Sequence, residues 1–288
     1  MTTLLAYPNV SEGRDAAAIA RIGTAFGPGL LDVHSDVDHH RSAYTLAGEP
    51  GELAHAVARG AAVATQLIAI DAHEGVHPRV GAVDVAPIIY LREEDRGAAC
   101  AEALVLADLL GQEVGLPVFL YGILAGGRTR AQLRRGGPAE LARRIAAGEL
   151  TPDFGPATLH PTAGAVLVGA RPPLVAFNVE LAPPATVADA KRIAALIREG
   201  GEEGLPGLRA IGLWLAESGL AQVSTNVEDH RAVPLAEVVA AVARHAPLAG
   251  AELVGLSPEA AFRGFPQDVP LRGYATIEQS LHRHRPTA

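Results

Sequence analysis

The spacing of apolar and polar residues in the first third of the chain predicts short strands alternating with helices. Short apolar runs between turn residues are typical of strands, and apolar positions three or four residues apart are typical of helices. The pattern predicts, in chain order, a strand at 4–7, a helix at 15–26, strands at 30–34 and 42–46, a helix at 52–67 and a strand at 83–91. This β-α-β-β-α-β order is that of a ferredoxin-like sheet.

The last third of the chain repeats the same order. It predicts a strand at 174–181, a helix at 187–198, strands at 209–215 and 221–227, a helix at 235–245 and a strand at 252–256. We therefore expect an α/β (α+β) chain of two ferredoxin-like β-α-β-β-α-β subdomains with their sheets side by side. The segment Arg171-Pro172-Pro173 is the expected boundary between an N-terminal subdomain, 1–172, and a C-terminal subdomain, 173–288.

The middle of the chain predicts a helix near 102–113, a strand at 118–121, an arginine-rich helix and a loop at 151–164. Six arginines lie between Arg128 and Arg144. Such a run is usually a solvated helix face, and we expect that here; the alternative is that it docks an anionic ligand tail. No phosphate-loop pattern follows Gly126 and Gly127, so no nucleotide site is expected.

Composition and charge narrow the class of protein. The 288 residues are 49% hydrophobic and 19% charged, which is ordinary for a folded globular chain. We expect no membrane association and a cytoplasmic location, since no apolar run reaches ~18–20 residues and the N-terminus does not resemble a signal peptide. The net charge of −8 and the 4% of aromatic residues argue against nucleic acid as a partner. The single Cys100 excludes an internal disulfide and a cysteine-based zinc site.

The densest polar cluster lies at 72–84, in the sequence AHEGVHPRVGAVD. It contains the H-E-x-x-H pattern of zinc proteases, but that pattern needs a helix, which Gly75 and Pro78 disfavour. We interpret His77, held in an extended conformation by Pro78, as a general acid/base, with Arg79 beside it to hold a carboxylate. The alternatives are a loop histidine that caps backbone groups and a surface ion pair of Arg79.

Two other loops are candidates for a site. The segment 35–42 contains Asp36, Asp38, His39, His40 and Arg41 at a predicted hairpin turn, where they would bind a metal or orient a substrate, or simply form a polar turn. The loop 151–164 is rich in Gly and Pro, which allow its backbone to approach a flat ligand; the alternative is an interdomain linker.

Ordered segments along nearly the whole chain resemble the formimidoyltransferase family, both the stand-alone glutamate formimidoyltransferases and the first domain of formimidoyltransferase-cyclodeaminase. The resemblance is carried by the segments PNVSEG at 8–13, DVDHHRS at 36–42, HEGVHPRVGAVDV at 73–85, PDFGP at 152–156, GAR at 169–171, AFN at 176–178 and QVSTN at 222–226.

The resemblance implies two α/β subdomains with the ligands between them. It also implies transfer of a formimidoyl group from N-formimidoyl-L-glutamate to tetrahydrofolate, a co-substrate, without a metal and in a homodimer. His77 corresponds to the family's catalytic histidine, and we expect Arg79, Arg41, Asp38, His40 and His73 to bind the formimidoyl amino acid. The folate-binding stretch corresponds to Gly155, Pro156, Ala157, Thr158, Leu159, His160, Pro161, Thr162, Ala163 and Gly164.

Four positions depart from the family pattern. The family often has Asp at Ala69, Asn at His40, an acid at Ile123 and an aromatic residue at Ala163. These departures keep three alternatives open: formimidoyl or formyl transfer involving a different amine, a non-catalytic folate-binding module, and a metallohydrolase using His73, His77 and the 36–40 cluster. Because the sequence ends at residue 288, we expect no cyclodeaminase domain in it.

Overall fold

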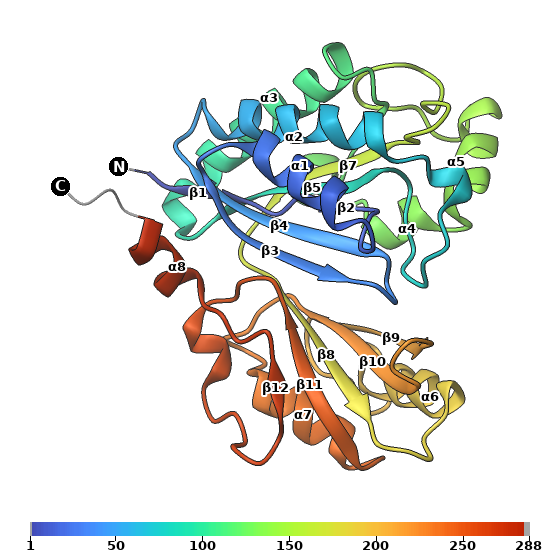
Figure 1. The fold of residues 1–288 in the computed structure, drawn as a ribbon, viewed down its shortest axis with the longest axis vertical. Coiled ribbons are helices and arrows are strands. Elements are labelled where there is room, and N and C mark those ends of the chain that lie inside the picture. The colour runs from blue at the N-terminus through green and yellow to red at the C-terminus, as the bar shows by residue number, and fades with distance from the viewer. Residues whose placement is uncertain (1, 285–288) are drawn as a thin grey trace. The chain divides into compact units, whose positions relative to one another are not determined.

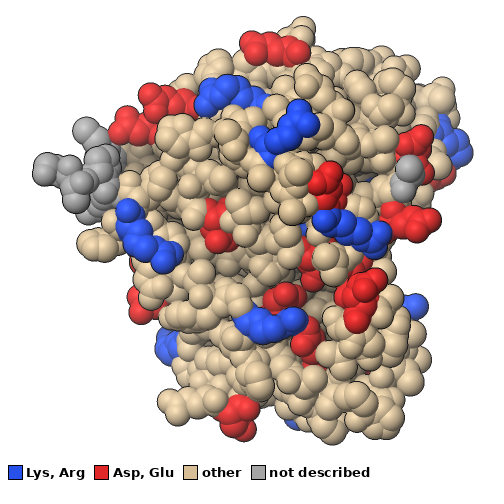
Figure 2. Space-filling view, in the orientation of Figure 1, with Lys and Arg blue, Asp and Glu red and all other residues tan. Residues whose placement is uncertain are grey.

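The computed structural model describes residues 2–284, and the chain divides into two compact units that meet between Pro172 and Pro173. Each unit has its own sheet and its own hydrophobic core (Figure 1). No helix within residues 2–284 is long and apolar enough to cross a membrane. On the face shown in Figure 2, acidic and basic side chains are interspersed.

The first unit is a seven-stranded mixed sheet with helices on both faces. Its elements are β1 (Leu4–Ala6), β2 (Asn9–Val10), α1 (Ala16–Phe26), β3 (Leu30–Asp36), β4 (Arg41–Gly48), α2 (Leu53–Leu67), η1 (Ile70–Ala72), β5 (Val83–Tyr90), η2 (Glu93–Asp95), α3 (Arg96–Gln112), β6 (Val118–Leu120), η3 (Gly122–Ala125), α4 (Arg130–Arg134), α5 (Gly137–Ala146) and β7 (Val166–Arg171). The edge strand β3 pairs with β4, and β1 and β2 both lie between β4 and β5. The strand predicted at 4–7 corresponds to β1, whereas β2, which follows after Tyr7 and Pro8, lies outside the predicted elements.

Alternation along the strands places apolar residues on both faces of the first sheet. Helices α1, α2 and α3 cover one face, where Leu4, Tyr44 and Ile88 are buried (Figure 1). Residues of opposite parity, such as Phe119 and Leu167, pack with Leu133 and Leu141 of α4 and α5. Successive side chains of a strand point to opposite faces of the sheet, and both faces are covered here. Every residue of strand β5 is therefore buried.

The amino end of α2 is capped by a residue distant in sequence. Glu102 of α3 is 3% exposed, and its carboxylate accepts the N–H groups of Gly51 and Ala54, both at 2.6 Å. These donors have no partner within the first turn of a helix, and an acceptor with negative charge also favours the helix dipole.

We expect Glu102→Ala to lower the free energy of unfolding by about 2–4 kcal/mol, because two charge-assisted hydrogen bonds are lost and the N–H of Ala54 is left buried without its acceptor. Urea unfolding followed by circular dichroism measures the change. Asp108→Ala, at an exposed position of the same helix, is the matched control and should change the midpoint little. Equal losses for the two variants would contradict the capping role.

The second unit is a five-stranded sheet with the order β12-β11-β8-β10-β9. Its elements are β8 (Val175–Leu181), α6 (Val187–Ile197), β9 (Leu208–Leu215), β10 (Leu220–Val227), α7 (Leu235–Ala243), β11 (Leu248–Val254), η4 (Glu259–Phe262), β12 (Leu271–Arg272) and α8 (Ile277–His284). All pairings are antiparallel except that of β11 with β12. Helices α6 and α7 pack on the sheet and bury its core with Phe177, Ile193 and Val238.

The predicted elements differ from the structure in a few places. Strand β7, which runs parallel to β5 and β6, is absent from the prediction. Strand β11 begins at Leu248, four residues before the predicted start at 252, because pairing with β8 extends into the segment Leu-Ala-Gly-Ala, whose residues have low β propensity. The short strand β12 and helix α8 also lie outside the predicted elements.

The arginine-rich stretch is not the single solvated helix face that the sequence predicts. It forms two helices, α4 and α5, and Arg144 is only 7% exposed. Its guanidinium donates to the carbonyl oxygens of Gln132 at 3.0 Å and Leu133 at 2.7 Å, near the carboxyl end of α4. Carbonyl groups there have no partner within the helix, which is why a cation is buried against them. Arg134 is also largely buried, whereas Arg143 is exposed as expected.

Candidate active site

The loop that follows η1 holds His73, Gly75, His77 and Arg79, and it is not helical. It packs against the turn between β3 and β4. A side chain at Gly75 would bring its Cβ within 2.6 Å of the His39 carbonyl oxygen, so this close approach requires glycine. The two histidines of the H-E-x-x-H pattern are therefore not presented from a helix, in agreement with the prediction from Gly75 and Pro78.

The imidazole of His77 is oriented by the backbone. Its Nδ1 lies 2.7 Å from the carbonyl oxygen of Pro78. The Pro78 carbonyl oxygen is nearer to Nδ1 than Arg41 Nη1, which lies 3.2 Å away, and the tautomer that donates to this carbonyl carries its lone pair on Nε2. Among residues 2–284, Nε2 has no hydrogen-bond partner. His77 is half-buried, and its free nitrogen is thus an acceptor for a proton from a ligand.

Asp84, at the start of β5, joins the groups around His77. Its carboxylate is fully buried and accepts the N–H of Val80 at 2.9 Å, Arg41 Nη1 at 2.7 Å and two nitrogens of Arg134. Burial by itself would raise the pKa of Asp84, but Arg134 and Arg41 outweigh it and hold that pKa well below its usual range. The carboxylate is therefore ionised at any pH near neutrality.

The same arginines act on His77. Arg41 Nη1 lies 3.2 Å from His77 Nδ1. Burial is the largest effect on the pKa of His77, followed by Arg41 and Arg134, and together these lower it well below 6.5 against the opposing effect of Asp84. His77 is consequently neutral at pH 7, which is the state required of a base.

His40 and His73 link the turn to the loop. Their rings stack with centroids 4.2 Å apart, and His73 Nε2 donates to the His40 carbonyl oxygen at 2.8 Å. His40 has a φ of 48°, in the left-handed region that Asn, Asp and His adopt more readily than other side chains. Its Nδ1 accepts the N–H of Gly13 at 3.1 Å. His is therefore one of the side chains that this backbone conformation accommodates.

Arg79 donates hydrogen bonds within its own loop. Its terminal nitrogens donate to the carbonyl oxygens of His73 and of Gly75, the latter at 3.2 Å. Both acceptors are backbone groups, so these two nitrogens do not form the surface ion pair considered from the sequence, and the predicted contact with a substrate carboxylate stays a prediction. Asp38 is buried in the β3–β4 turn, where Asp36 accepts the His39 N–H at 2.6 Å. The structure thus brings the predicted residues of the turn and the loop together.

The carboxyl end of the predicted folate-binding stretch, 155–164, lies against the two ends of the loop that holds His77. The carbonyl oxygens of Thr162 and Ala163 accept the N–H groups of Ile70 at 2.9 Å and Ala82 at 2.8 Å. Gly164 has a φ of 70°, and a Cβ there would meet the Val80 carbonyl oxygen at 2.3 Å. The residues 156–158 are exposed, whereas Ala163 is fully buried.

Comparison with known proteins decides the family. Residues 3–171 match the formiminotransferase domain, N-terminal subdomain, and residues 176–264 match the formiminotransferase domain. The chain belongs to the formiminotransferase family. The two matched regions lie on either side of the Pro172–Pro173 junction between the two units.

Similar formiminotransferases come from distant organisms. The chain is 39% identical to formimidoyltransferase-cyclodeaminase from Sus scrofa over 270 residues, which are 87% of this chain and 49% of that protein. It is 34% identical to glutamate formimidoyltransferase from Streptococcus pyogenes serotype M1, covering 87% of each chain. The glutamate formimidoyltransferase from Thermoplasma acidophilum is 32% identical, over 91% of this chain and 90% of that one. The chain therefore spans about half the length of the bifunctional relatives.

Two residues of this candidate site were missed from the sequence as individual candidates. Asp84 lies within the family-like segment, and its one available signal is a lone acid between Val83 and Val85 in an apolar run. Arg134 carries no signal, because it stands in an arginine run 50 residues away. Residues 2–284 contain no group of three or more His, Cys, Asp or Glu side chains that could hold a metal ion.

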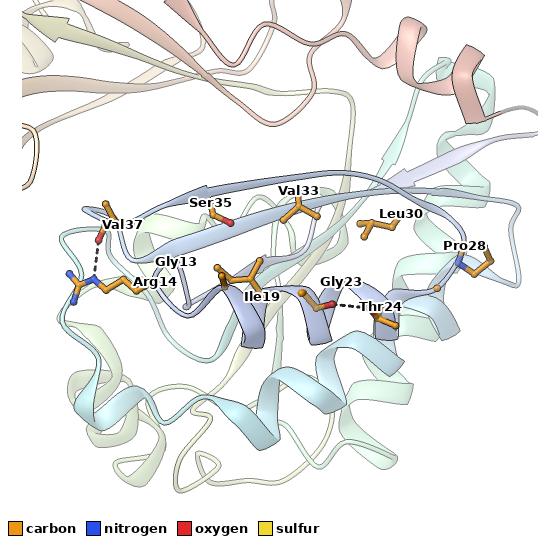
Figure 3. Close-up of a pocket in the computed structure, with 13 residues that line it drawn as sticks. Gly13, Arg14, Ile19, Gly23, Thr24, Pro28, Leu30, Val33, Ser35 and Val37 are labelled. Carbon is orange, nitrogen blue, oxygen red and sulfur yellow. Dashed lines mark hydrogen bonds between the residues drawn. The ribbon is translucent and has the colours of Figure 1, made fainter.

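A concave region of the first unit lies between α1 and β3. Figure 3 shows this groove, which has a volume of about 940 Å³ and is lined by apolar residues such as Ile19, Leu30 and Val33. Arg14 donates to the Val37 carbonyl oxygen at 3.1 Å at one end of it (Figure 3). Among the described residues that line the groove, Arg14 alone is ionisable. Acid–base chemistry is therefore concentrated around His77 and not in this groove.

Proposed function

We propose that the protein is a glutamate formimidoyltransferase that moves the formimidoyl group of N-formimidoyl-L-glutamate to tetrahydrofolate. The observation that carries the proposal is the His77 imidazole, which presents Nε2 as a proton acceptor beside two arginines. The stand-alone relatives named glutamate formimidoyltransferase support the same reaction. A cytoplasmic homodimer is part of the proposal, and sedimentation of the purified protein tests the dimer.

The proposal also covers the identity of the two units and the type of sheet in each. We propose that the two units, 1–172 and 173–288, are the N-terminal and C-terminal subdomains of a formimidoyltransferase, each built on a ferredoxin-like sheet. The strand neighbours β3-β4-β1-β5 in the first unit and β9-β10-β8-β11 in the second support this, since both place the first strand of the β-α-β-β-α-β order between the third and fourth.

His77 performs the proton transfers of the reaction. N5 of the folate attacks the amidine carbon, a carbon–nitrogen bond forms, and Nε2 of His77 takes the proton that N5 loses. The imidazolium then donates this proton to the glutamate nitrogen as the bond between that nitrogen and the amidine carbon breaks. The products are 5-formimidoyl-tetrahydrofolate and glutamate, and His77 returns to its neutral state. General acid/base catalysis of this kind contributes about 10²–10⁴ in rate.

The neighbouring residues hold the reactants and the loop. Arg41 is the candidate for binding a carboxylate of the donor, and Asp38 shapes the turn that carries it. Arg79, His40 and His73 position the loop of His77 through the contacts described above. The backbone of 155–164, with its exposed residues 156–158, is the proposed contact for the pterin.

The pH profile of kcat/KM should show that His77 stays in its neutral, basic form down to an unusually low pH. Because burial, Arg41, Arg134 and His39 lower the pKa of His77 against the opposing effect of Asp84, the neutral imidazole persists below pH 6.5. The acid limb of the profile is therefore expected below pH 6.5, with activity lost as pH falls through the lowered pKa. An acid limb at or above pH 6.5 would contradict the assignment.

The reaction itself is tested with purified protein, tetrahydrofolate and a panel of N-formimidoyl amino acids, followed through the ultraviolet spectrum of the folate. A spectral change with N-formimidoyl-L-glutamate alone is expected. Turnover with another amine identifies a different donor, and folate binding without turnover identifies a non-catalytic module. Metal analysis of the same sample tests the metallohydrolase alternative, which requires bound zinc or manganese.

A further inference from the structure

Two guanidinium groups share one buried carboxylate beside His77. The side chains of Arg41 and Arg134 are each 12% exposed, and that of Asp84 is fully buried. Among the described residues, Asp84 is the only acidic side chain that forms an ion pair with either arginine. The cluster therefore carries one positive charge in excess, in a place with little access to water. Removing a charge from water is costly unless a partner of opposite sign is present.

The hydrogen bonds of the two arginines leave specific donors unused. Arg41 donates Nε to Asn9 Oδ1 at 3.0 Å and Nη1 to Asp84. Arg134 donates Nε and Nη2 to Asp84. Arg41 Nη2 and Arg134 Nη1 remain without a hydrogen-bond partner in the part of the chain that the structure describes. Asp84 thus fixes two guanidinium groups while leaving one terminal nitrogen of each available.

We infer that Arg41 and Arg134 form a subsite for the α-carboxylate of the formimidoyl donor, with Asp84 as the residue that positions both. The inference rests on the proposed function and adds Arg134, which belongs to α4, to the substrate-binding residues. Guanidinium groups bind carboxylates through paired, charge-assisted hydrogen bonds, and a carboxylate supplies the negative charge that the cluster lacks.

The position of the subsite selects the α-carboxylate over the side-chain carboxylate. Arg41 Nη1 lies 3.2 Å from the His77 ring, so a carboxylate bound to Arg41 is close to the imidazole. In N-formimidoyl-L-glutamate the α-carboxylate is attached to the carbon that carries the departing nitrogen, whereas the side-chain carboxylate is separated from that carbon by two methylene groups. Binding the α-carboxylate therefore holds the departing nitrogen near the group that protonates it.

The kinetic test compares Arg134→Gln with Arg143→Gln. Arg143 belongs to the same arginine run but is 53% exposed and pairs with Glu140 and Glu149 on the surface, so its variant is the matched control. Arg134→Gln should raise the KM for N-formimidoyl-L-glutamate about 10- to 100-fold, the value of one or two charge-assisted hydrogen bonds, with the KM for tetrahydrofolate unchanged. Arg143→Gln should change both constants less than twofold. An unchanged donor KM in Arg134→Gln would overturn the subsite.

Two altered donors separate a binding role from a merely structural one. N-formimidoyl-4-aminobutyrate lacks the α-carboxylate, and N-formimidoyl-L-glutamine lacks only the charge of the side-chain carboxylate. With the glutamine derivative as donor, Arg134→Gln should raise the donor KM 10- to 100-fold above that of the wild-type protein. With the aminobutyrate derivative, the same substitution should raise it less than threefold. Equal losses with both donors would assign Arg134 to structure alone. Arg134→Lys keeps the positive charge and is expected to recover part of the KM, and it replaces Arg134→Gln if that variant does not fold.

Binding of L-glutamate distinguishes failure of the subsite from failure of the proposed reaction. Calorimetry should show glutamate binding to the wild-type protein that Arg134→Gln weakens about 10-fold or more, while 4-aminobutyrate binds both proteins alike. If the wild-type protein binds glutamate through Arg134 but transfers no formimidoyl group, the reaction is wrong and the subsite stands. If transfer occurs and the arginine variant binds glutamate as the wild-type protein does, the subsite is wrong and the reaction stands.

Discussion

His77→Ala is expected to reduce formimidoyl transfer by at least about 10²–10⁴-fold while the protein stays folded. The variant removes the only group proposed to take the N5 proton and return it to the departing nitrogen. The ring is half-buried, and Nδ1 forms its hydrogen bond with the carbonyl oxygen of the adjacent residue, Pro78. Its removal should therefore disturb the fold little. The measurement is kcat with N-formimidoyl-L-glutamate and tetrahydrofolate, together with the circular dichroism spectrum.

A histidine outside the site serves as the control for this result. His55 is exposed on α2, and His55→Ala should retain wild-type kcat. Binding of tetrahydrofolate to His77→Ala should persist, because the proposed folate contacts come from 155–164. Undiminished turnover in His77→Ala would remove this residue from the mechanism, whereas loss of folate binding with loss of turnover would show that it supports the binding site.

Asp84→Asn is expected to lower the free energy of unfolding by about 3–5 kcal/mol, because it leaves the Arg41 and Arg134 charges without their buried partner. Urea unfolding at pH 7 measures the loss. The pKa of Asp84 lies below its ordinary value of 3.8 in the folded protein, so the carboxylate contributes stability above that value. This contribution declines as pH falls through the lowered pKa, and the difference between wild type and variant should narrow accordingly.

A second variant separates charge from packing at this position. Removing one of the two arginine charges should relieve the imbalance, so Asp84→Asn combined with Arg134→Gln is expected to be less destabilised than the sum of the two single variants. Strict additivity would show that Asp84 and Arg134 do not interact energetically. A loss below about 1 kcal/mol in Asp84→Asn alone would be evidence against a buried ion cluster.

The order of strands and helices could be predicted from the sequence where each element has a clear period and clear ends. Helix α1 begins after Asp15, which caps it, and ends at Gly27, and both signals are visible in the chain. Strand β7 was missed because its residues 166–170 are continuously apolar and follow a Gly-containing loop; only its parallel pairing with β5 and β6 distinguishes it from loop or helix. The side-by-side placement of the two sheets stays a prediction.

The candidate site could be predicted in part. His77 and Arg41 stand in local clusters of polar residues, so their chemistry is visible in short segments. The contacts of Asp84 with Arg134 join β5 to α4, and a single sequence contains no measure of such a distant pairing. Arg79 shows another limit: its residue type and spacing suit a carboxylate, but the donation of its two terminal nitrogens to backbone carbonyls is visible only in the fold.

The acceptor that orients His77 is a main-chain carbonyl, that of Pro78. In many enzymes a carboxylate side chain does this work, and a single codon change can delete it. No substitution at position 78 removes a peptide oxygen, so the choice of protonated nitrogen in this family member is insulated from point mutation. In the proposed mechanism, donor binding depends instead on side chains such as Arg41 and Arg134, which a point mutation can replace while the hydrogen bond that orients His77 is kept.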